Sequence, residues 1–289
     1  MGGNANTVLA ELTALLSREN VESPVSIAKL ILTDRTGYSN AELIVDDVYI
    51  TQEQYIEVKR VANAVAFDRV PVQYALNQAS FRYLDLCVDE RVLIPRPESE
   101  MIVDIAKFYL QENNIERPLI ADIGTGSGAL AISFAHEIED CEVVASDISS
   151  EALQVARANA EYYSLLDKIT FLECDCLSSF EYFQHSRNHF DCIVSNPPYI
   201  PTKVYEKLDS LVIDNEPRIA LDGGLDGLDI FRKILEQCRW MIEDGGLFVF
   251  ELYETCLDLA SELARSAGLK RVSVMKDLAG KDRFLVAVG

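Results

Sequence analysis

The segment Asn196-Pro197-Pro198-Tyr199 follows an apolar run, Phe190 to Val194. Proline has a fixed φ and no backbone N–H, so this segment predicts a strand that stops abruptly and opens into a rigid polar corner. The Asn196 amide and nearby backbone carbonyls would then point beyond the strand end. Fixed acceptors of this kind suit a substrate that carries an –NH2 group. Taken alone, the same four residues could be an ordinary strand-ending turn.

A glycine-rich segment lies upstream, from Asp122 to Gly128, between an apolar run and a helical pattern. Glycines let the backbone turn tightly and approach a ligand closely, and the helix beyond offers unpaired N–H groups. A second predicted strand ends at Asp147, whose carboxylate could accept both hydroxyls of a ribose. The glycines also fit the pattern G-x-G-x-x-A, so a dinucleotide site remains an alternative.

From Leu119 onward, short apolar runs alternate with helical patterns, which predicts an α/β fold with a mainly parallel sheet and helices on both faces. The predicted strands are 119–123, 142–147, 169–174, 190–195 and 246–251, and the helices between them are about 128–139, 149–163 and 227–243. Two consecutive strands, 270–276 and 283–288, predict an antiparallel pair around Gly280 at or near the sheet edge.

Ligands of open α/β sheets bind beyond the carboxyl ends of the strands. Four features of this chain would meet at that edge: Gly124–Gly128, Asp147, Asp175 and Asn196–Tyr199. Their coincidence at one edge is a more specific signal than any one of them.

The first seventy residues predict a small helical bundle that ends at Pro71. Its apolar positions recur at helical spacing, as Leu9, Leu12 and Leu16, as Ile27, Leu30 and Ile31 after Pro24, and as Val58, Val61, Ala62 and Val65 behind a Thr51–Gln54 capping box. Residues 72–95 predict extended segments of a hairpin, and a helix is expected to begin at Pro97. The expected domains are therefore 1–71, 72–95 and 96–289.

The chain of 289 residues has a formal net charge of −21 and a pI near 4.5. Nucleic-acid phosphates repel so acidic a protein unless its basic residues cluster, and no strong basic cluster is present. We therefore expect no direct nucleic-acid partner, whereas a basic patch on a protein partner is easier to accommodate.

The seven cysteines, in a chain without a secretory signal, predict reduced thiols and a cytoplasmic protein. Cys174, Cys176, His185 and His189 lie close in sequence, but their spacing matches no zinc-finger pattern, so we expect no metal. No apolar run approaches the roughly 20 residues that span a bilayer, so no membrane association is expected.

Together these motifs resemble the S-adenosylmethionine-dependent methyltransferases that act on a planar amide or amino nitrogen. More narrowly, from about residue 20 to the C-terminus the chain resembles the bacterial peptide-chain release factor glutamine methyltransferases. The matching segments keep a similar order and spacing: Pro71–Tyr74, Val92–Glu100, Asp122–Gly128, Asn196–Ile200, Asn215–Pro217, Leu221–Leu228 and Asp277–Arg283.

The resemblance implies a fold and a reaction. The fold would be a small all-α N-terminal bundle that docks the protein substrate, a β-hairpin linker, and a seven-stranded, mainly parallel Rossmann-like sheet with an antiparallel C-terminal hairpin. The reaction would move a methyl group from S-adenosylmethionine to the side-chain amide nitrogen of the glutamine in the Gly-Gly-Gln loop of class-1 peptide-chain release factors.

The resemblance also implies roles for residues at matching positions. The glycine-rich segment would wrap the methionine part of the cofactor, Asp147 would hold the ribose, and Asp175 with Cys176 would border the adenine. The expected cofactor-binding residues are Asp122, Gly124, Thr125, Gly126, Ser127, Gly128, Asp147, Asp175, Cys176 and Asn196.

The substrate glutamine would be held by the polar corner. The expected catalytic residues are Asn196, Pro197 and Tyr199, and the expected substrate-binding residues are Asn196, Pro197, Pro198, Tyr199, Glu216 and Arg96. Tyr199 would pack on the amide plane and exclude water, while Arg96 and Glu216 would shape the pocket.

The sequence departs from the family pattern in three places. Cys174 replaces a common Gly, the segment Glu251-Leu252-Tyr253 lacks a usual Gly, and Asn77 stands where Gly is typical. Asn tolerates positive φ better than most residues, so the change at Asn77 is compatible with the same backbone. These differences put local loop shapes in doubt.

Three other functions stay open on the residues alone. DNA adenine N6-methylation would use the same corner, because the exocyclic amine of adenine is also planar, although the acidic charge argues against it. An NAD-dependent oxidoreductase would use the glycine loop but would leave Asn196–Tyr199 unexplained. The last alternative is a non-catalytic cofactor-binding regulator.

Overall fold

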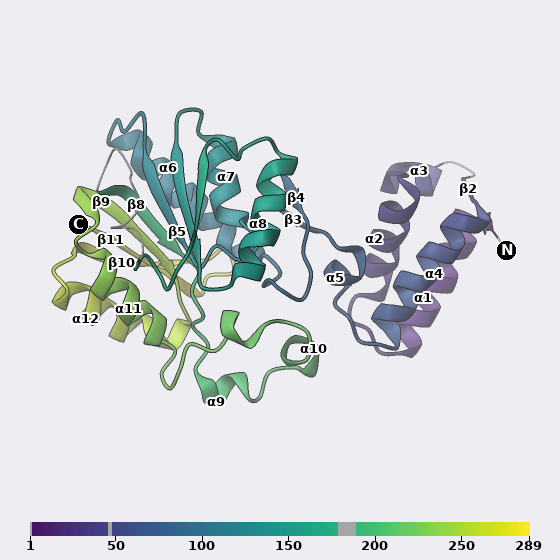
Figure 1. Cartoon of the computed structure of the whole chain (residues 1–289). Helices are drawn as coiled ribbons and strands as arrows, with labels where there is room; N and C mark the ends of the chain where they lie inside the picture. Colours follow the sequence, from purple (N-terminus) through teal and green to yellow (C-terminus); the bar gives the residue numbers. More distant parts are fainter. Residues whose placement is uncertain (1, 46–47, 179–188) are drawn as a thin grey trace. The chain divides into compact units, whose positions relative to one another are not determined.

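The structure is a computed structural model that describes residues 2–45, 48–178 and 189–289. The chain divides into two compact units, Met1–Gln78 and Ala79–Gly289. Figure 1 shows the first unit as a group of helices and the second as a sheet with helices on its faces. None of the helices formed by the described residues combines the length and the apolar character that crossing a bilayer requires.

The first unit is a helical bundle with a pair of two-residue strands. Its elements are β1 (Gly3–Asn4), α1 (Ala5–Arg18), α2 (Pro24–Thr36), α3 (Asn40–Val45), β2 (Tyr49–Ile50), α4 (Gln52–Ala66) and α5 (Val72–Leu76). The predicted capping box is confirmed, because the Thr51 hydroxyl accepts from the Gln54 N–H at 3.2 Å and the Gln54 side chain accepts from the Thr51 N–H at 3.0 Å.

Two details of the first unit differ from expectation. Leu30 is 45% exposed, and the face of α2 that packs into the core carries Ala28, Ile31 and Leu32, which also have helical spacing. Residues Val72–Leu76 form α5 in place of an extended segment, so the compact unit continues past Pro71 to Gln78. Asn77 ends α5 with φ +58, the conformation in which Asn can substitute for Gly.

The second unit begins with the hairpin β3 (Ala79–Phe81) and β4 (Leu84–Leu86), which pair antiparallel. The turn residue Arg82 holds this hairpin against two helices. Its guanidinium pairs with Glu137 at the end of α7 at 2.5 Å and donates to the backbone oxygen of Glu100 at the start of α6 at 3.0 Å.

The sheet of the second unit has seven strands in the order β10-β11-β9-β8-β5-β6-β7. Its strands are β5 (Leu119–Ile123), β6 (Glu142–Asp147), β7 (Ile169–Glu173), β8 (Phe190–Ser195), β9 (Ile242–Glu251), β10 (Lys270–Lys276) and β11 (Asp282–Val288). The strands β5 to β9 are mutually parallel, and β11 and β10 add the predicted antiparallel pair at the edge. The predicted sheet is therefore confirmed.

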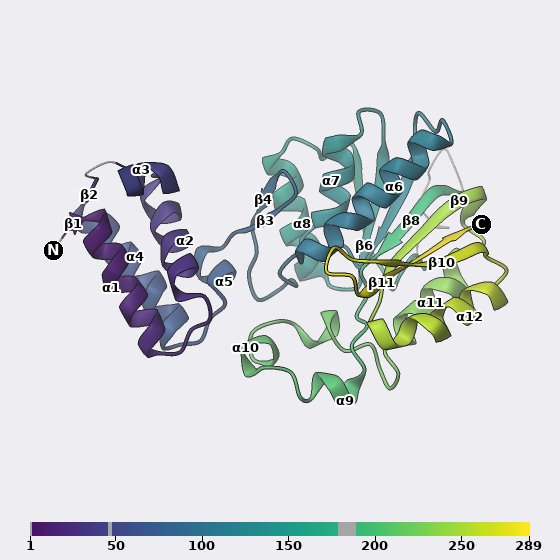
Figure 2. The same ribbon diagram turned by 180° about the vertical axis from the view of Figure 1, so that it is seen from behind.

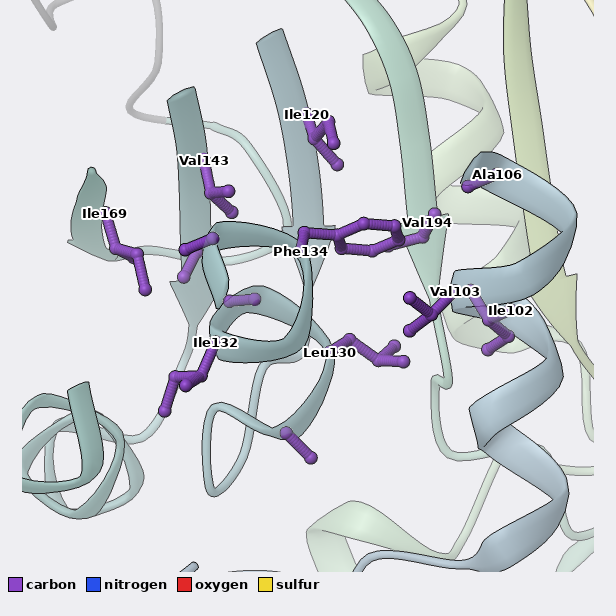
Figure 3. Packing of buried hydrophobic residues seen from close by; sticks show 14 of the residues in the cluster. Ile102, Val103, Ala106, Ile120, Leu130, Ile132, Phe134, Val143, Ile169 and Val194 are labelled. Atoms are coloured by element: carbon purple, nitrogen blue, oxygen red, sulfur yellow. The ribbon is translucent and has the colours of Figure 1, made fainter. Parts of the chain in front are cut away.

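Helices cover both faces of this sheet, as Figures 1 and 2 show from opposite sides. On one face lie α6 (Glu100–Glu112), α7 (Ala129–Glu137) and α8 (Ser150–Tyr162), and on the other lie α11 (Asp229–Cys238) and α12 (Leu257–Ser266). Figure 3 shows Phe134 of α7 beside Val194 of β8, with Ile120 and Val143 on neighbouring strands. Alternate residues of the inner strands β5, β6, β8 and β9 belong to the two cores, as a period of two requires.

The expected helix 227–243 is shorter than predicted. It ends at Cys238, and β9 begins at Ile242, which pairs with Phe190 of β8, instead of at residue 246. The pairing of β9 with β8 is irregular between Ile242 and Leu247. The sequence did not predict α12, nor a segment between β8 and α11 that contains α9 (Thr202–Tyr205), α10 (Ser210–Ile213) and the short helix η3 (Arg218–Ala220).

A buried Asn supports the glycine-rich segment from behind. Asn159 of α8 donates to the backbone oxygen of Ser127 at 2.9 Å and to that of Cys87 at 3.0 Å, and it accepts from the Cys87 N–H at 2.8 Å. Its side chain thus ties the glycine-rich segment to the chain that follows the hairpin.

Candidate active site

The carboxyl ends of neighbouring parallel strands meet at one edge of the sheet. At the end of β5, Ile123 pairs with Ser146 of β6 and with Ser195 of β8, while β6 ends one residue later at Asp147. Two segments therefore start from adjacent strand ends: Gly124–Gly128, called the glycine loop below, and Asn196–Tyr199, called the corner.

Two cavities open at this edge. The first is lined by several predicted site residues: Gly124, Gly126, Asp147, Asp175, Cys176, Asn196, Pro197 and Pro198. The second is lined by a further set: Arg96, Asp122, Gly124, Thr125, Gly126, Ser127 and Asn196. Because Gly124, Gly126 and Asn196 line both cavities, the two spaces adjoin at the point where the glycine loop faces the corner.

Three predicted site residues line neither cavity. Gly128 lies at the N-terminus of α7, with φ +84, where a Cβ would come within 3.2 Å of the Ala156 Cβ of α8. Tyr199 packs against the apolar cluster under α11 and α12, so its ring does not form a cavity wall. Glu216 is buried directly before Pro217, which does line the first cavity.

The glycine loop leaves space on its cavity side. Gly124 and Gly126 have φ values of +72 and +55, and a Cβ built at either residue would meet nothing within 4 Å. The loop is fixed from the other side, where the N–H groups of Gly124 and Thr125 donate to the Ser146 oxygen at 2.8 and 2.9 Å. The result is a rigid backbone cradle open toward a ligand.

Asp122 is buried at the base of the second cavity. Its Oδ2 accepts from the Thr125 hydroxyl at 2.7 Å and from the Ala131 N–H at 3.1 Å. Its Oδ1 has no hydrogen-bond donor among the described residues. Burial raises the pKa of Asp122 to about 7, although the two hydrogen bonds oppose the shift. A buried carboxylate oxygen without a donor, in a residue that lines a cavity, suits a cationic group of a ligand.

Two further acids stand on the first cavity. Asp147 accepts from the Gly126 N–H and the Ser149 N–H, each at 2.9 Å, and burial raises its pKa despite these bonds. Asp175 is half-exposed and pairs with Lys233 of α11 at 2.7 Å. Asp147 is thus fixed by the glycine loop itself, whereas Asp175 is held by a partly exposed lysine that also lines the first cavity.

The cysteines near the first cavity are not nucleophiles. Burial raises the pKa of Cys176 to about 12, so its thiol stays protonated at neutral pH. The Cys174 thiol donates to the Cys176 backbone oxygen at 3.2 Å and so takes part in the local turn. No described residues form a group of three or more potential metal ligands, and His185 lies outside the residues that the structure describes.

The corner is held by side chains from three other elements. The Asn196 amide donates to the Ser99 hydroxyl at 2.9 Å, and that hydroxyl donates to Glu251 at the end of β9 at 2.5 Å. The Tyr199 hydroxyl donates to the other oxygen of Glu251 at 2.8 Å. At the start of the corner, the Ser195 hydroxyl donates to the Ile123 backbone oxygen at 2.7 Å.

Two glycines let a loop press against the corner backbone. A Cβ at Gly223 would lie 2.6 Å from the Pro198 oxygen, and one at Gly227 would lie 2.3 Å from the Tyr199 oxygen. Only residues without a side chain fit at these distances, which gives a physical reason for glycine in the Leu221–Leu228 segment.

Arg96, which lines the second cavity, forms an ion pair with Glu216, which lines neither cavity. The Arg96 guanidinium lies 2.5 Å from Glu216 Oε1, and the Ile94 N–H donates to Oε2 at 3.3 Å. The Glu216 side chain is only 3% exposed. The pair joins the chain before α6 to the segment between α10 and η3, so it braces the wall next to Pro217.

Three neighbours of the site were not predicted from the sequence: Ser99, Glu251 and Lys233. Ser99 lies in the segment Val92–Glu100, which matches the family pattern, and Glu251 lies in the segment Glu251-Leu252-Tyr253, which departs from it. Neither residue was expected to contact the site. Their hydrogen bonds connect positions 97 and 152 residues apart, and one sequence carries no signal for contacts at such separations.

A curated protein from Rhodopirellula baltica, named release factor glutamine methyltransferase, is 34% identical to this chain over 277 residues, which cover 94% of this chain and 92% of that protein. The chain belongs to the release factor glutamine methyltransferase family. A protein of the same name from Lactococcus lactis is 41% identical over 216 residues, covering 74% of this chain and 76% of that protein.

Two further comparisons agree with a methyltransferase. The family model described as RNA cap guanine-N2 methyltransferase matches residues 117–211. The crystal structure of a methyltransferase from Pyrococcus furiosus has a TM-score of 0.51 and 21% identity, covering 82% of this chain and 98% of that chain, which shows a shared fold. The predicted fold class and the prediction that the chain is a methyltransferase are confirmed, and the oxidoreductase alternative is not supported.

The buried ion pair yields a stability prediction. Arg96→Met should lower the free energy of unfolding by about 3 kcal/mol, because it leaves the Glu216 carboxylate buried without its cation. The double variant Arg96→Met with Glu216→Leu should regain most of this loss, since no buried charge remains. Urea unfolding followed by circular dichroism measures both.

A matched control is Lys276→Met, which removes an exposed ion pair with Asp282 in the same unit. It should change the free energy of unfolding by less than about 1 kcal/mol. If Arg96→Met costs no more than this control, the bracing role of the buried pair is wrong.

Proposed function

We propose that this chain transfers the methyl group of S-adenosylmethionine to the side-chain amide nitrogen of the glutamine in the Gly-Gly-Gln loop of class-1 peptide-chain release factors. One observation carries the proposal: Asn196 and the glycine loop line the same two adjoining cavities. The family to which the chain belongs supports it, since the relatives from Rhodopirellula baltica and Lactococcus lactis are named release factor glutamine methyltransferase.

The residues present fit this cofactor. A backbone cradle with no Cβ on its cavity side admits the methionine part, and the unpartnered Asp122 Oδ1 offers an acceptor for its ammonium group. Asp147 would accept from the ribose hydroxyls, and Asp175 with Cys176 would border the adenine in the first cavity. When bound, the cofactor supplies a methyl group on a positively charged sulfur, which is an activated electrophile.

The corner would solve the main chemical difficulty, which is that a carboxamide nitrogen is a poor nucleophile. Its lone pair is delocalised into the carbonyl group. If Asn196 Oδ1 and the Pro197 backbone oxygen accept its two N–H bonds, the nitrogen is fixed with one face toward the methyl group. Such positioning can supply up to roughly 7–11 kcal/mol of a bimolecular barrier.

The same acceptors favour the transition state. The N–H groups become more positive as the new bond forms, so acceptors placed on them stabilise the transition state more than the ground state. The N-methylated amide cation is strongly acidic and loses its proton readily. No strong general base is therefore required of this chain.

The other assignments follow the same proposal. The helical first unit would dock the release factor, the hairpin region would link the domains, and the remainder would carry catalysis. All seven cysteines are free thiols, which is compatible with a reducing cytoplasm. The acidic chain would favour a basic patch on its protein partner.

Asn196→Ala tests the corner. The variant should keep its affinity for S-adenosylmethionine in calorimetry yet lose at least about 100-fold in kcat, because the acceptor that orients the amide is gone. The measurement is transfer of labelled methyl groups to a purified class-1 release factor, with mass spectrometry to locate the modified glutamine. Asn113→Ala, an exposed Asn at the end of α6, is the matched control.

Near-normal turnover in Asn196→Ala would contradict the assignment of the corner. A parallel reaction with double-stranded DNA addresses the adenine alternative, and the proposal expects no transfer to it. Methylation of DNA but not of the release factor would overturn the proposed substrate.

The pH dependence of cofactor affinity tests Asp122. Because the pKa of Asp122 is raised to about 7, its carboxylate becomes available to an ammonium group as the pH rises through that value. An α-amino group loses its own proton near pH 7.7–8.0. Calorimetric affinity for S-adenosylmethionine should therefore rise from about pH 6 toward neutrality and fall above about pH 8. Asp122→Asn should abolish the rise and keep the fall, and a preserved rise would contradict the assignment.

A further inference from the structure

A carboxylate is buried next to the corner without lining either cavity. Glu251 is 1% exposed at the end of β9, although burying a charge is unfavourable unless it is well hydrogen-bonded. Its two oxygens accept from the hydroxyls of Ser99 and Tyr199 at 2.5 and 2.8 Å. Tyr199 belongs to the corner itself, and the Ser99 hydroxyl contacts Asn196 of the corner.

The protonation of these groups determines the direction of each hydrogen bond. Burial raises the pKa of Tyr199, so its hydroxyl remains protonated and donates to Glu251. Burial raises the pKa of Glu251, while the hydrogen bonds from Ser99 and Tyr199 and the charge of Arg283 oppose the shift. In its ionised form the carboxylate can only accept, so the single proton of the Ser99 hydroxyl then also points at Glu251. The Ser99 oxygen can then only accept from the side chain on its other side.

That side chain is the amide of Asn196, 2.9 Å away. With the Ser99 proton committed to Glu251, Asn196 must present its NH2 group to Ser99, because its oxygen would face only lone pairs. The Asn196 Oδ1 is then left for another donor. The hydrogen-bond network thus assigns which end of the Asn196 amide is the oxygen and which is the NH2 group. The positions of the heavy atoms alone do not distinguish the two.

Ser99 lies at the junction between the short helix Pro97–Ser99 (η1) and α6, where its own backbone is helical, with φ −64 and ψ −18. Its side chain makes no capping hydrogen bond there. The hydroxyl is used for the network between Glu251 and Asn196 instead.

We propose that the Ser99–Glu251 pair is a positioning device that fixes the Asn196 amide with its oxygen toward the substrate N–H groups. This inference rests on the proposed function of the corner. An Asn196 side chain turned the other way would present its own NH2 group to the substrate NH2 group, so that two donors would face each other. The other oxygen of Glu251 holds Tyr199, so one carboxylate fixes both ends of the corner.

The kinetic test compares isosteric variants. Glu251→Gln keeps the shape but adds a donor, so the direction of the hydrogen bonds is no longer imposed, and Ser99→Ala removes the link. Both should lower kcat at least about tenfold on the release factor, with cofactor affinity unchanged in calorimetry. Ser99→Thr keeps the hydroxyl and should restore kcat to within about threefold of the original chain.

Asp191→Asn is the matched control, because Asp191 is a buried acid at the other end of β8, where it accepts from the Leu119 N–H at 2.7 Å. It should leave kcat unchanged. A purely structural Glu251 predicts that Glu251→Gln keeps its turnover and gains stability, since a buried charge is removed. Unchanged kcat in Glu251→Gln and Ser99→Ala, or a loss of cofactor affinity equal to the loss of kcat, overturns the inference.

A substrate-free measurement separates this inference from the proposed function. The side-chain amide resonance of Asn196 in a ¹⁵N–¹H spectrum is identified by its disappearance in Asn196→Ala. It should shift in Ser99→Ala and Glu251→Gln but not in Asp191→Asn. Unshifted resonances in these two variants overturn the positioning role. If the variants shift as expected but the original chain fails to methylate a release factor, only the proposed function is contradicted.

Discussion

The parallel pairing of β5 with β8 is the constraint on which the site depends. Ile123 lies opposite Ser195, and the Ser195 hydroxyl donates to its backbone oxygen at 2.7 Å. One residue further along each strand, the chain turns into the glycine loop and into the corner. A shift of this pairing by one residue would send the Asn196 side chain to the opposite face of the sheet. The register therefore sets the distance between the two halves of the proposed reaction.

The site also concentrates buried acids at one edge of the sheet. Burial raises the pKa of Asp122 to about 7 and also raises that of Glu251. A carboxyl whose folded pKa is raised binds its proton more tightly in the folded state than in the unfolded state. The contribution of Asp122 to stability is therefore greatest below its unfolded pKa of about 3.9 and is lost as the pH rises toward 7. At neutral pH, burial of these carboxylates therefore lowers the stability of the fold. We interpret this loss of stability as the consequence of keeping carboxylate oxygens available as hydrogen-bond acceptors for a ligand and for the corner.

Much of the fold could be predicted from the sequence because its strands are short apolar runs with clear ends. The bounds of β5, β6, β8 and β10 match the expectation, and the glycine loop and Asn196 were placed at the correct edge. The segment with α9, α10 and η3 was missed because each helix has only three or four residues, too few for a helical period. The Ser99–Asn196–Glu251 network was missed because its members are brought together only by packing of distant elements. The packing of Tyr199 behind the cavity wall depends on the apolar cluster under α11, which no local pattern reveals.

A crystal structure of the complex with S-adenosylhomocysteine would test the central claim most directly. The account predicts that the nucleoside occupies the first cavity and that the ammonium group lies within hydrogen-bond distance of Asp122 Oδ1. The sulfur should then face Asn196 Oδ1 across open space that a glutamine side chain can enter. A nucleoside bound elsewhere, or a sulfur separated from Asn196 by protein atoms, would contradict the account.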